Sequence, residues 1–71
     1  MDWREEATLV RTLTTGDSYV VGSGPVWWLI IMALQGHEGP LNEMTIRTAG
    51  GRDYVSDDIR RLAKHPDRPR T

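Results

Sequence analysis

The stretch that decides the fold of this 71-residue chain is LNEMTIRTAGGRDYVSDDIRRL, residues 41–62. Asn42, which follows Gly39-Pro40, is a favourable N-cap for a helix. The pair Gly50-Gly51 is a typical helix end. The pattern therefore predicts a short capped helix, a glycine turn and a second helix with a basic outer face.

The second helix is expected to run from near Tyr54 to about His65, just before Pro66. Asp53 or Ser56 would cap it, and the acids that follow would complement the positive end of its dipole.

The spacing of Val55, Ile59 and Leu62 places these three side chains on the core side of that helix. The residues that then point outward are Asp57, Arg60, Arg61 and Lys64. Three cations on one face suit contact with phosphates, whereas an aspartate would repel them. Alternatively, Asp57 pairs with Arg60 or Arg61 as an ordinary surface ion pair, worth about 0.2–0.5 kcal/mol.

The first half of the chain predicts two more helices and one strand. Asp2 to Leu13 is expected to be helical, with Asp2 as its cap. Ser18 to Val21 has the composition of a short strand bounded by glycines. No second strand is evident, so this strand would be an isolated bridge or an edge that pairs with another molecule.

The segment from Val26 to about Gln35 is expected to form a helix that is apolar nearly all round. Pro25 would occupy its first position, with Ser23 or Gly24 as the cap, and Gly36 would end it. Such a helix must be buried on most sides. It is either the central helix of the domain or partly covered by another subunit.

Trp27 and Trp28 are adjacent in that helix, so both cannot face one core. One of them could reach the surface as an interface residue. Alternatively, the first helix and the segment around Tyr19 cover it.

Together these expected elements give the fold class: a mainly α, small helical domain of about four helices with one short strand and a helix-turn-helix-like C-terminal half. Residues 1–65 would form this single domain, and residues 66–71 a disordered basic tail. There is no cysteine, no signal peptide and no apolar run long enough to span a bilayer, which together suggest a cytoplasmic protein.

The net charge of -1 hides an asymmetry. Residues 1–58 carry four basic side chains against nine acids, whereas residues 59–71 carry five basic side chains against Asp67 alone. A basic end on an acidic body could touch a polyanion, associate head to tail with another copy, or simply be a solvated tail.

Signs of catalysis or metal binding are missing from the sequence. His37-Glu38 lacks the second ligand pair that a metal site needs. The adjacent acids Glu5-Glu6 and Asp57-Asp58 do not share one helix face, and neither Ser18 nor Ser23 has a base near it in sequence. We therefore expect neither an enzyme nor a cofactor.

From residue 26 to residue 65 the expected order is hydrophobic helix, short capped helix, glycine turn and helix. This order resembles the winged helix-turn-helix family of transcriptional regulators. Residues 54–62 resemble the recognition helix of the family, and Ile46, Ala49 and Gly51 match positions of its first motif helix and turn. Three departures are a turn about two residues short, the missing wing after His65, and the acidic Asp57.

The resemblance implies a small helix-turn-helix DNA-binding regulator, of the kind encoded by bacteria or phages, that contacts double-stranded DNA with its last helix. A homodimer would be required for half-site recognition, through Trp27 or Trp28. The residues expected at the DNA are Arg52, Tyr54, Ser56, Arg60, Arg61, Lys64 and Arg68. The alternative is a small adaptor or inhibitor that binds a protein through an acidic and aromatic surface.

Overall fold

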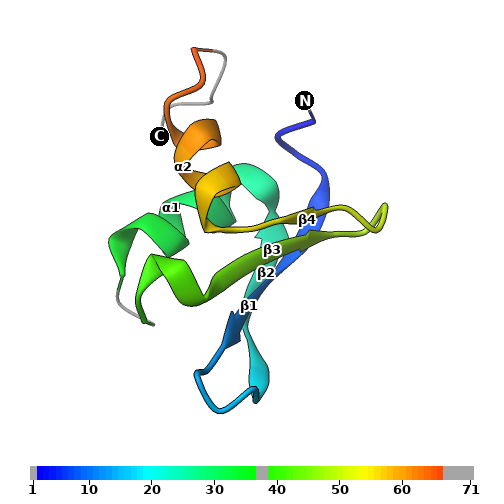
Figure 1. Cartoon of the computed structure of the whole chain (residues 1–71). Helices are drawn as coiled ribbons and strands as arrows, with labels where there is room; N and C mark the ends of the chain where they lie inside the picture. The colour runs from blue at the N-terminus through cyan, green and yellow to red at the C-terminus, as the bar shows by residue number, and fades with distance from the viewer. Residues whose placement is uncertain (1, 37–38, 67–71) are drawn as a thin grey trace.

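Two β-hairpins, each followed directly by a helix, make up the chain (Figure 1). The computed structural model describes residues 2–36 and 39–66. The elements are β1 (Glu6–Thr12), β2 (Ser18–Pro25), α1 (Val26–Gln35), the 3-10 turn η1 (Leu41–Glu43), β3 (Met44–Thr48), β4 (Asp53–Tyr54) and α2 (Ser56–Ala63).

The four strands form one antiparallel sheet in the order β2-β1-β3-β4. The structure is thus a small α+β domain, and the prediction of a mainly α domain with about four helices is wrong. Residues 2–13 are not a helix, because β1 occupies most of this segment. Residues 42–50 are not one either, because η1 and β3 occupy them. The described residues therefore contain no helix-turn-helix.

The two hairpins close with the same three-residue loop. In the first, Leu13 and Asp17 close the loop and Gly16 has a φ of 94°. In the second, Thr48 and Arg52 close it and Gly51 has a φ of 88°. A glycine in the left-handed region at the third loop position is a common way to join antiparallel strands. Gly51 was predicted to end a helix, but it turns one strand into the next.

The chain is consequently a tandem of two ββα units, a repeat that sequence reasoning did not detect. The inner strands β1 and β3 pair antiparallel at the centre of the sheet, and β2 and β4 form its edges. Both helices contact β3, α1 also contacts β1 and β2, and the two helices contact each other. One face of the sheet is therefore covered by both helices.

The core lies between that face and the helices. It consists of Ala7, Leu9, Val26, Leu29, Ile30, Ala33, Met44, Ile46 and Ile59. Alternation along each strand explains this set: Leu9 and its partner Ile46 point to the helices, whereas the neighbouring Val10 and Thr45 point to the opposite face.

The helix from Val26 to Gln35 was predicted correctly, and Gly36 ends it with a φ of 72°. Its start differs from the prediction. Pro25 is the last residue of β2 rather than the first of the helix, and neither Ser23 nor Gly24 caps it. Instead, the N–H groups of Val26 and Trp27 donate to the carbonyls of Glu5 and Trp3, at 3.0 Å each.

The last helix was predicted, but it is shorter than expected. Val55 precedes it as the N-cap residue, and the Asp58 carboxylate accepts a hydrogen bond from the Val55 N–H at 3.2 Å. The predicted caps, Asp53 and Ser56, do not cap the helix. Ile59 is fully buried as expected, whereas Val55 is half exposed because it lies before the first turn.

No helix in residues 2–36 and 39–66 is long and apolar enough to cross a membrane. The predicted basic tail after Pro66 and the His37-Glu38 pair lie outside the described residues.

Candidate interaction surface

The strand Ser18–Val21 was predicted, and the structure extends it to Pro25 and places it at one edge of the sheet. Its inner side pairs with β1 from Thr12↔Ser18 to Glu6↔Pro25. Among the described residues, no strand pairs with its outer side. An edge of this kind presents a row of backbone donors and acceptors to solvent.

The register of β2 shifts once, between Leu9 and Val10 of the partner strand, so Val21 is an extra residue in the ladder. The bulge separates Ser18–Val20 from Gly22–Pro25. Tyr19 and Val20 are exposed in the first part, Val20 by 63%. The second part carries two glycines, whose missing side chains leave room for the helix above.

Two side chains of α1 lie over those glycines. The methyl carbon of Met32 is 3.1 Å from the position that a Cβ on Gly22 would occupy, and Cδ1 of Trp28 is 3.6 Å from the corresponding point on Gly24. The helix therefore lies along the edge strand, with Trp28 and Met32 on its β2 side.

The outward side of α1 is apolar. Val26, Leu29, Ile30 and Ala33 are buried, and at 100° per residue Trp28 and Ile31 lie on roughly the opposite side of the helix. Trp28 is 43% exposed and Leu34 is 42% exposed. The helix contains no charged residue.

Of the two alternatives that the sequence left open for the tryptophan pair, the structure has the one in which a ring reaches the surface. Trp27 is half buried and Trp28 is exposed. Their rings meet edge to face, with centroids 6.0 Å apart and an interplanar angle of 72°. This contact holds the Trp28 ring in place, because an edge-to-face pair is a favourable aromatic geometry.

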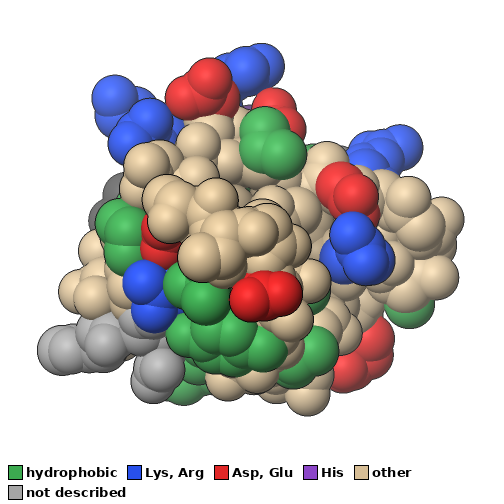
Figure 2. Space-filling view, turned by 60° about the horizontal axis from the view of Figure 1, so that its bottom comes forward, with side chains coloured by type: hydrophobic (Ala, Val, Ile, Leu, Met, Phe, Trp, Pro, Cys, Tyr) green, Lys and Arg blue, Asp and Glu red, His purple; other side chains and the backbone are tan. Residues whose placement is uncertain are grey.

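We call the outer edge of β2 together with the outward side chains of α1 the β2–α1 surface. Its exposed large apolar residues are Tyr19, Trp28 and Leu34, whereas the exposed Val20 is paired with Val10 and points to the opposite face of the sheet. The space-filling view shows hydrophobic side chains gathered into a patch, with charged side chains at its margins (Figure 2). All nine Lys and Arg and all ten Asp and Glu lie outside residues 18–36.

Arg11 supports one end of this surface. Its Nε donates to Glu43 Oε1 at 2.8 Å, and its Nη1 donates to the Tyr19 hydroxyl at 3.1 Å. The hydrogen bond to Glu43, followed by that to Tyr19, raises the pKa of Arg11 above its ordinary value. Arg11 thus links the hairpin to η1 and orients Tyr19.

The residues predicted at DNA fall into two groups in the structure. Arg52 and Tyr54 come together beside the β3–β4 turn, where their hydrogen bond raises the pKa of Arg52. They line an open hollow of about 320 Å³ that also contains the acids Asp2 and Glu5. This neighbourhood is mixed in charge rather than basic.

The second group lies on α2 and just after it. Ser56 begins the helix, and Arg60 and Arg61 are exposed on it, with the exposed Lys64 following. Both arginines are paired with acids one turn earlier: Arg60 with Asp57 at 3.3 Å and Arg61 with Asp58 at 3.6 Å. The ion pair that the sequence offered as the alternative for Asp57 is confirmed. Arg68 lies outside the described residues.

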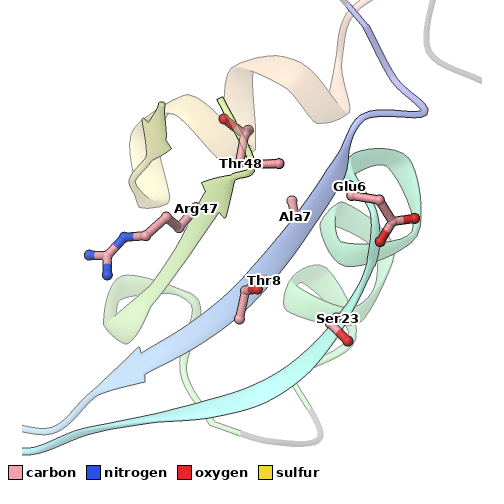
Figure 3. A pocket seen from close by; sticks show the side chains of 7 residues that line it. Glu6, Ala7, Thr8, Ser23, Arg47 and Thr48 are labelled. Carbon is pink, nitrogen blue, oxygen red and sulfur yellow. The ribbon is translucent and has the colours of Figure 1, made fainter. Parts of the chain in front are cut away.

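The open face of the sheet carries another hollow, of about 310 Å³ (Figure 3). Its side chains come mainly from β1 and β3 and include Thr8, Ser23 and Arg47. Arg47 donates to Asp53 at 3.1 Å, and both side chains are about half exposed. The Arg47 cation is therefore already paired with a carboxylate.

The sequence offered Trp27 or Trp28 as an interface residue and predicted the strand at Ser18, but it did not show that Trp28 and this strand form one surface. The signal that could have shown it is the uncharged run from residue 18 to residue 36. Comparison with known proteins adds no family, because no family model, curated protein or solved structure matches the chain.

Proposed function

We propose that this chain is a small protein-binding module that acts without catalysis and contacts its partner through the β2–α1 surface. The observation that carries the proposal is the exposure of Trp28 on an uncharged helix beside an edge strand. This is the protein-binding alternative from the sequence, with the contact placed on an aromatic and uncharged surface rather than an acidic one.

Exposed aromatic side chains held in a fixed position are favourable binding groups. Tryptophan is enriched among the residues that dominate interface energies, because it buries a large area at a small cost in side-chain entropy. Trp28 is held by Trp27 and by the strand beneath it.

A matched pair of variants tests this proposal. Trp28→Glu places a charge on the β2–α1 surface, and Val55→Glu places one at a half-exposed apolar residue beside α2. Proteins retained on the immobilised chain should be lost with Trp28→Glu and kept with Val55→Glu, provided both variants give the wild-type circular dichroism spectrum. Equal retention by both variants would contradict the proposal.

DNA binding is the second candidate, supported by the exposure of Arg61 (79%) and Arg60 (56%) on α2. It no longer has a helix-turn-helix to support it, and Asp57 and Asp58 lie on the same helix. Duplex binding should weaken steeply with salt and be lost in the Arg60→Ala plus Arg61→Ala variant. Unchanged affinity in that variant would exclude α2 as the DNA contact.

A further inference from the structure

We propose that the partner of the β2–α1 surface is a second copy of this chain, joined by antiparallel pairing of the two β2 edges at Gly22–Gly24. The inference rests on the proposed function, since it names the partner of that same surface.

The two edges of the sheet differ in their capacity to pair. β4 has two residues, and an exposed Arg47–Asp53 ion pair lies beside it. β2 has eight residues and carries no charged side chain, so its only protecting features are the bulge at Val21 and Pro25 at its end, which has no N–H. The bulge at Val21 interrupts β2, so a new strand can align continuously with only one part of it.

The part from Gly22 to Gly24 is favoured because Met32 lies over Gly22 and Trp28 over Gly24. Antiparallel pairing of identical strands creates a two-fold axis normal to the sheet, and both α1 helices then lie on the same face. Met32 and Trp28 of one copy would meet their counterparts across the axis. Strand pairing and helix contact would thus occur together.

The chain already uses this arrangement internally. Its two ββα units meet through the antiparallel pair β1–β3, with both helices on one face of the sheet and in contact with each other. A β2–β2 pair would join two chains in the same way and would form a continuous eight-stranded sheet.

The charge distribution favours a second copy over a different protein. A surface with no charged residue between positions 18 and 36 can meet its own copy without repulsion. Electrostatic complementarity, which steers unlike partners to one another, has nothing to act on there. Stable interfaces bury about 800 Å² on each partner, more than a short strand edge supplies, so the outward side of α1 must take part.

Cysteine cross-linking tests the geometry directly, because the chain has no native cysteine. Ser23 and Ser18 are both exposed on β2. In a pair centred near Ser23, the two Ser23 Cα atoms lie about 5 Å apart, within reach of a disulfide. The two Ser18 residues then lie five residues on either side of the axis, which places them about 33 Å apart along the strands.

Under mild oxidation, Ser23→Cys should form a disulfide-linked dimer with at least a tenfold higher yield than Ser18→Cys. Adding Trp28→Glu to Ser23→Cys should abolish the cross-link, whereas adding Val55→Glu should leave it. Equal yields at positions 18 and 23 would overturn the proposed pairing.

Sedimentation velocity of the wild-type chain distinguishes failure of the self-pairing proposal from failure of the proposed protein-binding function. Association to twice the 8.1 kDa mass of one chain is expected as concentration rises from micromolar to millimolar. A monomer throughout would overturn self-pairing. The retention experiment with Trp28→Glu and Val55→Glu would still decide separately whether the surface binds another protein.

Discussion

The thioether of Met32 lies over Gly22, with its methyl carbon 3.1 Å from the position that a Cβ on this glycine would occupy. The contact joins α1 to the edge strand without any polar group. It also explains how a helix can approach β2 closely, since a larger residue at position 22 would push Met32 outward.

Alanine at the two glycines of β2 should differ in its cost to stability. Gly22→Ala meets only the end of a flexible methionine, so its free energy of unfolding should change by less than about 1 kcal/mol. Gly24 has a φ of 152°, and Gly24→Ala should destabilise by about 1 kcal/mol or more. Urea denaturation followed by tryptophan fluorescence measures both. A larger loss from Gly22→Ala than from Gly24→Ala would contradict the described packing.

Gly39 should tolerate a side chain less well than Gly51. Both have positive φ values, 144° and 88°, so alanine strains the backbone at either position. At Gly39 an added Cβ would also lie 2.6 Å from the Arg11 guanidinium, whereas nothing lies within 4 Å at Gly51. Thermal unfolding should show the lower Tm for Gly39→Ala. Equal Tm values would show that Arg11 does not occupy this position.

The ion pair between Arg11 and Glu43 should be energetically coupled. Each of Arg11→Met and Glu43→Gln should lower the urea midpoint, and the double variant should lose less than the two single losses together. The exposed pair Arg47 and Asp53 is the matched control, and its cycle should be close to additive. Additive losses for the first pair would mean that the 2.8 Å contact contributes nothing specific.

Ile59 should be the residue on which α2 depends most. It is fully buried in the core, and Ile59→Ala should cost about 2–5 kcal/mol, a large share of the stability of so small a domain. Val55→Ala, at a half-exposed position, should cost far less. Urea denaturation compares the two, and similar losses would contradict the placement of α2.

The helix α1 could be predicted because local signals and tertiary structure agree there. Pro25 and Gly36 bound a continuous apolar run, and a run so apolar and of this length is expected to form a buried helix. The adjacency of Trp27 and Trp28 showed that they could not both face one core, but left open whether the second ring is exposed or covered. Which of the two is exposed could not be predicted, because it depends on the direction of the sheet beneath the helix.

The strands β1 and β3 were not predicted, because the spacing of their apolar residues fits both the helical period and the strand period. Trp3, Ala7 and Val10 have helical spacing, yet Leu9 is inward and Val10 outward, as in a strand. Around Met44, a good N-cap and a glycine pair suggested a helix. The β-branched residues of β3 satisfy their backbone by pairing with β1, which lies far away in the sequence.

The DNA-contact residues were chosen on the assumption of a second motif helix. That helix exists as α2, but the segment expected to form the first motif helix and to orient α2 is the strand β3. Charge spacing alone placed Asp57 correctly beside Arg60. The β2–α1 surface could not be predicted as a whole, because only the sheet order shows that β2 is an edge and only the tertiary packing places α1 beside it.

The most direct test of β2 self-pairing is a dilution series of backbone amide NMR spectra on the wild-type chain. Chemical shifts should depend on concentration at the amides of Gly22–Gly24 and at the indole N–H of Trp28, and remain constant along α2. Spectra that do not change with concentration, or changes centred on Arg60 and Arg61, would contradict it.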